Sequence, residues 1–357
     1  MIEQWDWGEF GRKNTYSVYR VDPFTLQEYG DPLPIHEDLG SITFDKNSDN
    51  FYSATLNFLE PVSRDYMVRV KQHIQLGDNK SAEVTHGTFF IDKCPETHIY
   101  GHSVYKANCY SPMMRYTKDV LFGALYWDVG TRVTDAIKEV VEGYGGKFDI
   151  LPGNNMLRTF SVPISFPDDS KLYDMISDMA YWINCYVYPD AFGYIMLAPY
   201  TLPEEQPVSF EFEEGRFNIC KSGYQLEDLQ SDSYNRWKVF YSNSEGSGLA
   251  IAQLPSTHPY SFERIGRWVT YSEQIQNPCS ESELQALANR RAAQNSVNDR
   301  FLQIEFAYTP DVEIGNTVRY TNTKDGPEPI QHDCEVTQME INLNVENMAT
   351  AKLRILR

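Results

Sequence analysis

The sequence lacks the local signatures that usually reveal an enzyme or a secreted protein. It contains no G-x-S-x-G, no Walker P-loop, no G-x-G-x-x-G and no H-E-x-x-H, the common motifs of acyl transfer, nucleotide binding and zinc hydrolysis. No window approaches the ~18 apolar residues of a membrane span. The first residues have neither the basic nor the apolar region of a secretory signal. We therefore expect a protein made in a cytoplasm, without a membrane span, and the missing motifs favour an assembly role over catalysis.

Cysteine is scarce, and no two cysteines form a C-x-x-C pair. Six cysteines spread through a chain of this length signal neither a zinc site nor a disulfide framework. We expect them to be buried, reduced thiols. They are Cys94, Cys109, Cys185, Cys220, Cys279 and Cys334.

Positive charge is also in short supply, whereas aromatic residues are abundant. Lys and Arg number 31 against 50 Asp and Glu, which gives a net charge of −19. A surface this negative repels nucleic acid and anionic membranes as a whole, although it is compatible with a local basic patch. Aromatic residues make up 14%, led by 24 Tyr, and this composition favours β-sheets. The 357 residues are enough for two to four compact units with a sizeable core.

The clearest local pattern runs from Phe166 to Tyr200. The segment Pro167–Ser170 supplies cap oxygens and negative charge, which predicts the start of a helix. A helical stripe follows, and after Asn184 the period becomes extended around a turn at 189–193, which predicts a β-hairpin. We expect the stripe to pack on the sheet that contains the hairpin. Its residues are Leu172, Met175, Ile176, Met179, Ala180 and Ile183.

The chain divides into three regions by pattern. Residues 1–115 look all-β, 116–205 look α+β with a further helix starting near Gly130, and 206–357 return to strands with a helix inserted at 281–295. The best linker lies at 201–207. The expected strands include 16–21, 41–44, 54–58, 66–71, 88–92, 104–110, 210–213, 235–241, 249–252, 302–308 and 336–345.

Two patterns imitate metal sites. His98 and His102 have a spacing that suits metal ligands on a helix, but their neighbours look extended and a glycine lies between them. The segment Asp45–Asp49 imitates the start of a calcium loop, but Asn50 replaces the required glycine and Leu56 stands where the bidentate glutamate belongs. We expect polar turns and strands at both places.

One cluster of carboxylates could serve glycoside hydrolysis. It comprises Glu211, Glu213 and Glu214, and the first two lie on the outer face of an alternating strand, where solvated charge explains them. We therefore assign no catalytic, cofactor-binding or metal-binding residue and expect no cofactor.

Motifs along most of the chain resemble those of phage tail hub proteins: the baseplate hubs of contractile phages, the late-control D proteins and the N-terminal hub part of tail-associated lysins. Gly87–Asp92 resembles a family strand, and the helix and hairpin of 172–200 resemble another shared element. Asn235–Val239 resembles the strand that opens the next domain. Helix 281–295, strand 301–306 and turn 312–318 resemble the family's closing elements, with Asn316 in place of the usual aspartate.

The resemblance implies a structural virion protein that forms a ring, usually a homotrimer. Residues 1–115 and 206–357 would be two tube-like β-barrel domains flanking an α+β middle domain at 116–205. The implied role is a tail-tip or baseplate hub that closes the tail tube and binds the distal tail, tube and tape-measure proteins. It would be assembled in the host cytoplasm and let DNA pass without specific binding, which a strongly acidic chain favours because cationic walls would hold phosphates.

A second hypothesis stays open. An aromatic-rich β chain also suits a receptor-binding or carbohydrate-binding protein of the tail tip, with weak hydrolase activity from Glu211 or Glu213. A soluble metabolic enzyme is the third hypothesis.

Overall fold

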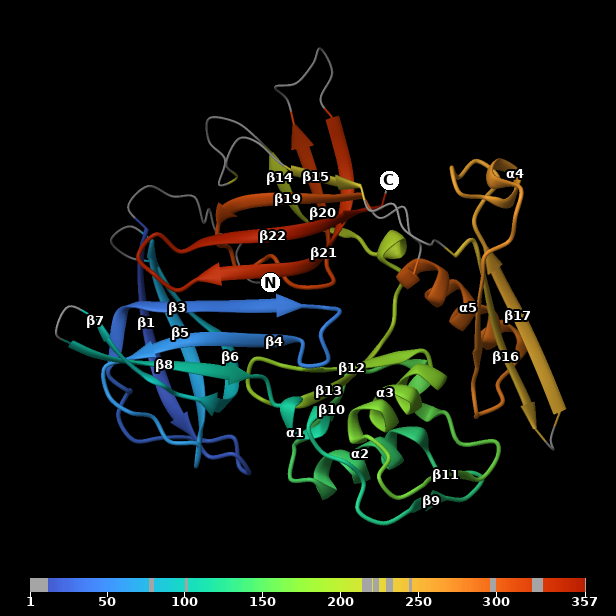
Figure 1. Cartoon of the computed structure of the whole chain (residues 1–357), viewed down its shortest axis with the longest axis horizontal. Coiled ribbons are helices and arrows are strands. Elements are labelled where there is room, and N and C mark those ends of the chain that lie inside the picture. The colour runs from blue at the N-terminus through green and yellow to red at the C-terminus, as the bar shows by residue number, and fades with distance from the viewer. Residues whose placement is uncertain are drawn as a thin grey trace.

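The structure, a computed structural model, describes residues 12–76, 80–99, 102–213, 220, 225–228, 234–243, 246–295, 300–322 and 330–356. It is mainly β with an α+β part, as the sequence predicted. Figure 1 shows two bodies side by side: one built from the first and last strands of the chain, and one built from its middle. Each body has its own large hydrophobic core.

The N-terminal strands form a twisted sheet in the order β3-β4-β8-β6-β5-β1-β2, with β7 attached to β8. Alternate side chains of β4 are buried without exception, which is the pattern of a half-buried strand. The elements are β1 (Lys13–Val21), β2 (Glu28–Tyr29), β3 (Ile35–Asp45), β4 (Tyr52–Phe58), β5 (Met67–Leu76), β6 (Lys80–Lys93), β7 (Glu96–Ile99) and β8 (His102–Tyr110).

The C-terminal strands continue the same sheet. They run in the order β15-β19-β22-β21, and β20 joins β21 to β14. Because β21 also pairs with β3, the two sets of strands make one 14-stranded sheet. The elements are β14 (Val208–Glu213), β15 (Gln225–Asp228), β19 (Arg300–Ala307), β20 (Thr317–Asn322), β21 (Ile330–Asn342) and β22 (Met348–Ile355). The sequence patterns had not identified β20 or β22.

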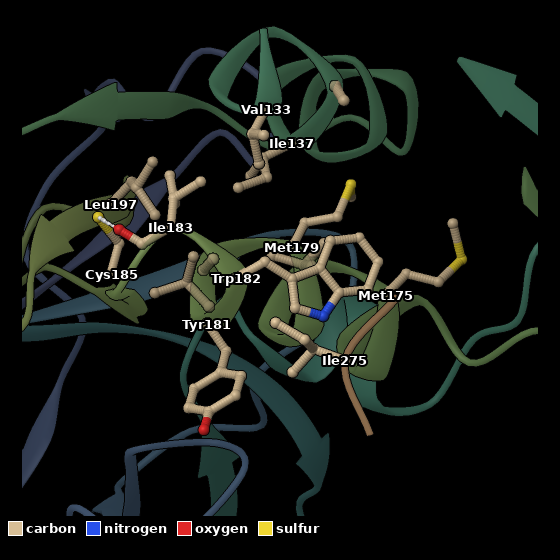
Figure 2. Packing of buried hydrophobic residues seen from close by; sticks show 14 of the residues in the cluster. Val133, Ile137, Met175, Met179, Tyr181, Trp182, Ile183, Cys185, Leu197 and Ile275 are labelled. Atoms are coloured by element: carbon tan, nitrogen blue, oxygen red, sulfur yellow. Dashed lines mark hydrogen bonds between the residues drawn. The ribbon is translucent and has the colours of Figure 1, made fainter. Parts of the chain in front are cut away.

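The middle of the chain contains the predicted helix and hairpin. They are α3 (Leu172–Trp182), β12 (Cys185–Pro189) and β13 (Ile195–Pro199). The predicted stripe is buried, and Figure 2 shows Met179 and Trp182 of α3 between Val133 and Ile137 of the preceding helix and Ile275 from a later part of the chain. The other elements are α1 (Met114–Thr117), β9 (Leu125–Trp127), α2 (Val133–Gly143), β10 (Phe148–Ile150), η1 (Asn154–Leu157), β11 (Ile164–Phe166) and η2 (Pro203–Glu205).

The expected cap of α3 is wrong in detail. The cap position is Lys171, and no side chain caps the helix there. The Asp168 carboxylate instead accepts the Gly123 N–H at 2.7 Å, and the Ser170 hydroxyl donates to the Pro167 carbonyl at 2.7 Å. A tertiary donor therefore takes the oxygen that the local pattern assigned to the helix.

The middle body contains an internal repeat related by an approximate two-fold axis. The unit β9–α2 corresponds to β11–α3, and β9 pairs with β11 in an antiparallel register. The shift along the sequence that maps β9–α2 onto β11–α3 maps Val120 to Thr159 and Arg132 to Lys171. The two isolated bridges, Val120 with Lys171 and Arg132 with Thr159, therefore exchange places. The backbone bonds obey it too: the Leu121 N–H donates to the Ser170 carbonyl at 2.8 Å, and the Phe160 N–H donates to the Thr131 carbonyl at 2.9 Å.

The same offset relates the turns of the two units. Gly130 and Asp169, which precede the helices, have φ values of 88° and 64°, and Gly145 and Asn184, which follow them, have 80° and 52°. These left-handed conformations suit Gly, Asn and Asp. The two halves share backbone geometry although their side chains differ, so the repeat is a property of the fold.

A segment of the C-terminal region packs on the middle body. It contains β16 (Arg236–Asn243), β17 (Gly246–Gln253), α4 (Phe262–Ile265), β18 (Thr270–Gln274) and α5 (Glu281–Asn295). The helix predicted at 281–295 is confirmed. Its Leu284, Leu287 and Ala288 join the core of α2 and α3. The division at 115 and 205 stays a prediction, and the packing adds that residues 236–295 cover the middle body.

Candidate functional site: the junction of the two β regions

The first and last parts of the chain meet edge to edge at β3 and β21. Residues 41–45 pair with residues 338–342 in an antiparallel register. The Leu39 N–H donates to the Leu343 carbonyl at 3.1 Å, and the Leu343 N–H returns a bond to the Gly40 carbonyl at 2.8 Å. Ile42 and Ile341, which face each other, are both fully buried. The junction is therefore continuous sheet with a shared core.

Gly40 makes the close approach of β3 and β4 possible. Its φ is 116°, and an added Cβ would lie 1.9 Å from the Thr55 carbonyl oxygen. Only glycine fits such a position. The register of β3 against β4 shifts between Ile35 and Gly40, and such an irregularity bends a strand locally. This bend precedes the part of β3 that pairs with β21.

A buried carboxylate joins charges from both β regions. Glu335 on β21 is 1% exposed and forms ion pairs with Lys46, which follows β3, and with Arg354 on β22 at 2.6 Å. The Arg354 guanidinium also donates to the Ala293 carbonyl at the end of α5. Since a buried charge is tolerated only when it is paired and hydrogen-bonded, the three side chains fix the strands and α5 to one another.

Arg290 of α5 makes a second connection, to the middle body. It is 6% exposed and donates to the Cys185 carbonyl at 2.8 Å. Its guanidinium lies over the Tyr200 ring, 4.3 Å from the centroid, a cation–π contact. Burial lowers the pKa of Arg290 to about 10 and raises the pKa of Tyr200 to about 12. At neutral pH the pair is a cation over a neutral ring.

A third connection clamps the β12–β13 turn to the N-terminal strands. Arg69 of β5 donates to the Phe192 carbonyl at 2.7 Å and to the Leu26 carbonyl at 3.1 Å, and it pairs with Glu28 at 3.0 Å. The Thr88 hydroxyl donates to the Ala191 carbonyl at 2.8 Å. Loop carbonyls that would otherwise need water are thus satisfied by buried side chains.

The sequence patterns had not identified Glu335, Arg354, Arg290 or Arg69. For Arg69 a signal was present: it stands between Val68 and Val70 in a strand that is buried over its first four residues. A charge within a buried strand needs a partner, but the sequence does not say which one.

The residues first considered for metal binding lie on surfaces and turns. His98 is exposed on β7, within 3.7 Å of Glu96, and the side chain of His102 lies outside the described residues. The Asp45 carboxylate accepts the Asn47 N–H at 2.9 Å, as in a tight turn. Over the part of the chain that the structure describes, three or more His, Cys, Asp or Glu side chains never gather in a way that could hold a metal ion.

The residues first considered for hydrolysis point outward. Glu211 and Glu213 are exposed on β14, and Glu211 lies 3.5 Å from Arg319, whereas Glu214 lies outside the described residues. The six cysteines stand outside disulfides, as expected; four are buried, whereas Cys94 and Cys279 are half-buried, which corrects the expectation for these two. Burial raises the pKa of Cys185 and of Cys334 to about 12, so these thiols stay protonated and poorly nucleophilic.

Two shallow hollows occur on the surface. One, of about 510 Å³, lies at one end of β1, β5 and β6 beside Lys13, His73 and Lys80. The other, of about 380 Å³, lies beside Arg158, Cys279 and Glu283. Both are open to solvent and have linings that are at least half polar, unlike the enclosed apolar sites that hold small molecules. Among the helices that the structure describes, none is long and apolar enough to cross a membrane.

Comparison with known proteins identifies the fold. No family model and no curated protein sequence matches the chain. Among solved structures, a tail protein from Neisseria meningitidis MC58 has a TM-score of 0.67 at 12% identity, covering 95% of this chain and 96% of its own. The 43 kDa tail protein of prophage MuSo2 from Shewanella oneidensis has a TM-score of 0.60 at 10% identity, and the match covers 96% of this chain and 98% of that protein. Prophage tail protein gp18 from Listeria monocytogenes has a TM-score of 0.55 at 11% identity, and the match covers 95% of this chain and 94% of that protein.

The chain thus has the fold of phage tail proteins over nearly its whole length, which confirms at the level of the fold the resemblance that its motifs carried. A similar arrangement occurs in the Francisella PdpA-VgrG complex, with a TM-score of 0.57 and 11% identity, where the match covers 97% of this chain and 58% of the other.

Proposed function

We propose that this chain is the hub of a phage tail tip or baseplate, a structural protein without enzymatic activity that closes the tail tube as a homotrimeric ring. The observation that carries the proposal is the edge-to-edge pairing of β3 with β21. It shows how an N-terminal and a C-terminal β region of this chain fit together within one molecule. Cyclic symmetry can repeat one kind of contact until a ring closes.

The ends of the large sheet support the proposal. Among the described strands, β15 pairs only with β19, and β2 pairs only with β1. Proteins cover, pair or block exposed strand edges because they otherwise template aggregation. A ring of three chains would give both ends of each sheet a neighbour, as closed β assemblies do.

The rigid junction fits the mechanical role. Three buried arginines, Arg69, Arg290 and Arg354, each connect two or more segments that are far apart in the sequence. A hub must transmit force between the tube, the distal tail protein and the tape-measure protein without its domains separating. The net charge of −19 would keep DNA from adhering to the ring during its passage.

Native mass spectrometry tests the ring. We expect a mass of three chains of 41.2 kDa, formed by the chain alone or when the tail-tube or distal tail protein of the same phage is added. Negative-stain images of that species should show a closed ring with a central opening. A chain that stays a 41.2 kDa monomer with every one of these partners would contradict the proposal.

The alternative role as a receptor-binding or carbohydrate-binding protein has a separate test. A glycan array on the purified chain should show no binding above background. Specific binding that Glu211→Gln or Glu213→Gln abolishes would favour the alternative, because both side chains are accessible to ligand.

A further inference from the structure

The small sheet β17-β16-β18 has one face that the described residues leave largely uncovered, apart from the Phe262 ring of α4, which stacks on Trp268 at 4.7 Å. Its inner face, with Trp237, Val239 and Ala250, packs into the core shared with α5. The outer face follows from the strand register, since side chains alternate between faces. It comprises Arg236, Lys238, Phe240 and Ser242 of β16, Ser247, Leu249, Ile251 and Gln253 of β17, and Trp268, Thr270, Ser272 and Gln274 on and beside β18.

The outer face differs in charge from the rest of the molecule. Its twelve residues include two cations and no carboxylate, in a chain with 50 Asp and Glu. Arg236 lies over the Trp268 ring at 4.7 Å, and Lys238 lies over the Phe240 ring at 4.6 Å. Both cations are held in place by aromatic rings and present positive charge at a fixed position.

The outer face is also apolar at its rim. Leu249 is 53% exposed and Ile251 is 43% exposed, on neighbouring outward positions of β17. Aromatic rings, arginine and exposed aliphatic side chains together are the composition of protein interfaces.

The strand β17 has an open edge. Among the described strands it pairs only with β16. The Leu254 N–H donates to the Asn235 carbonyl at 3.1 Å, so Leu254 points its backbone groups toward β16. Because the backbone groups of successive residues point to alternate edges of a strand, those of Leu249, Ile251 and Gln253 point away from β16. There the Ile251 carbonyl accepts the Gln285 side chain at 3.1 Å.

Apart from this contact with Gln285 of α5, the open edge lacks the features that protect other edges. The eight residues of β17 include no charged residue and no proline, and the register with β16 has no bulge. Natural proteins block exposed edges with these devices. A weakly protected edge beside an apolar rim therefore indicates a place where another strand pairs. In Figure 1, β17 is the strand farthest from the large sheet, where a partner can reach it.

The size of the face decides the occupant. Three strands ~4.8 Å apart and ~25 Å long cover on the order of 350 Å². A stable contact between two globular copies needs about 800 Å² from each partner, whereas one extended segment that also forms main-chain hydrogen bonds needs less. Positive charge on an otherwise acidic chain selects for carboxylates.

We propose that the open edge of β17 and its outer face bind an extended segment of a partner protein by strand addition, and that this segment carries alternating apolar and acidic side chains. Main-chain bonds to Leu249 and to the N–H of Ile251, whose carbonyl already accepts Gln285, would supply affinity, as in other cases of strand addition. Arg236 and Lys238 would supply the preference for acidic residues. This inference is independent of the trimeric ring, because a single chain contains the complete site.

Fluorescence anisotropy with short synthetic peptides tests the proposal on the full chain. The probe is a fluorescein-labelled eight-residue peptide of alternating valine and glutamate. A one-residue shift of its register along β17 exchanges its two faces, so either the valines or the glutamates can lie on the outer face of the sheet. We expect it to bind at least ~10-fold more tightly than the same peptide with lysine in place of glutamate. Methylation of every peptide nitrogen should abolish binding, because it removes the main-chain donors of both peptide edges.

Variants of the chain separate edge pairing from charge. Ile251→Pro removes an N–H at the open edge but no bond to β16, so the fold should survive, and we expect binding to fall by ~10-fold or more. Lys238→Glu should reduce the preference for the glutamate peptide. Val345→Lys, at a residue 79% exposed on the other body, is the matched control and should bind normally.

Four results with the peptides would overturn the proposal. They are no binding of the glutamate peptide, equal binding of the lysine peptide, equal binding of the N-methylated peptide, and full binding by Ile251→Pro. Concentration-dependent self-association that Leu249→Lys removes would show that the occupant is a second copy, which also contradicts the proposal.

Discussion

The buried carboxylate of Glu335 gives the sharpest test of how the two β regions are joined. The side chains of Glu335 and Arg354 are 2% and 8% exposed, so their charges are both out of water. Glu335→Gln keeps the volume but removes the negative charge, and Arg354 then loses this counter-charge while it keeps the Ala293 carbonyl. Removing one partner of a buried pair costs about 3–5 kcal/mol. We expect a loss of that size.

Lys46 provides the control. Its side chain is 27% exposed, so Lys46→Met should cost about 1 kcal/mol or less, the usual range for a pair in contact with water. The double variant Glu335→Gln with Arg354→Met should cost at least about 1 kcal/mol less than the sum of the single variants, because each single change leaves one partner without the other.

Guanidinium unfolding, followed by tryptophan fluorescence, measures the total loss. Hydrogen exchange of peptides from β21 and β22 shows whether the loss is at the junction, which matters because the two bodies can unfold in separate steps. A Glu335→Gln variant within about 0.5 kcal/mol of the parent, the usual effect of a surface change, would refute the reasoning. Additive single and double variants would refute it as well.

Three further predictions concern other parts of the molecule. Burial and the nearby Arg12 charge lower the pKa of His86 to about 3, so the unfolded chain binds the extra proton first. Stability should fall as pH drops below about 6.5, with a slope that approaches about 1.4 kcal/mol per pH unit below about pH 5.5. Urea titrations of His86→Gln should show a smaller slope. Ile176→Asp should unfold the middle body, with a loss of at least about 4 kcal/mol of stability, because it places a charge in a fully buried site. The control Ile176→Val should cost about 1 kcal/mol of stability. An Asp variant with normal calorimetric unfolding would show that the core is placed wrongly. Glu211→Gln combined with Glu213→Gln should change unfolding and ring assembly by less than about 0.5 kcal/mol, and a larger change would give these exposed side chains a structural role.

Local patterns predicted the elements whose burial is regular. Strand β4 and the helix at 281–295 were predicted because their apolar residues recur at fixed spacing. Strand β22 was not, although alternate residues are buried, because it buries alanine at positions where the pattern looks for large apolar side chains. Its buried Arg354 further obscures the alternation. Periodicity reports side-chain size and polarity, so it misses a strand whose inward positions are small or charged.

The candidate site could not be predicted in the same way. Lys46 and Glu335 are far apart in the sequence, and although Glu335 stands between Cys334 and Val336 in a buried strand, nothing local says that Lys46 is its partner. The bend at Gly40 precedes the pairing of residues 41–45 with 338–342, and glycine is needed there because its φ is 116° and because Thr55 lies against it. Such contacts exist only after the chain has folded.

The sequence by itself determined the mainly β fold, the helix and hairpin at 172–199, and the resemblance to tail hub proteins, because these rest on patterns within a few residues of one another. Only the tertiary structure decided that the first and last strands form one sheet, that residues 236–295 cover the middle body, and that β17 keeps an open edge beside an acid-free face. The physical reason is that strand pairing and the burial of charge depend on which distant segments meet, and the local period of a strand does not specify its neighbour.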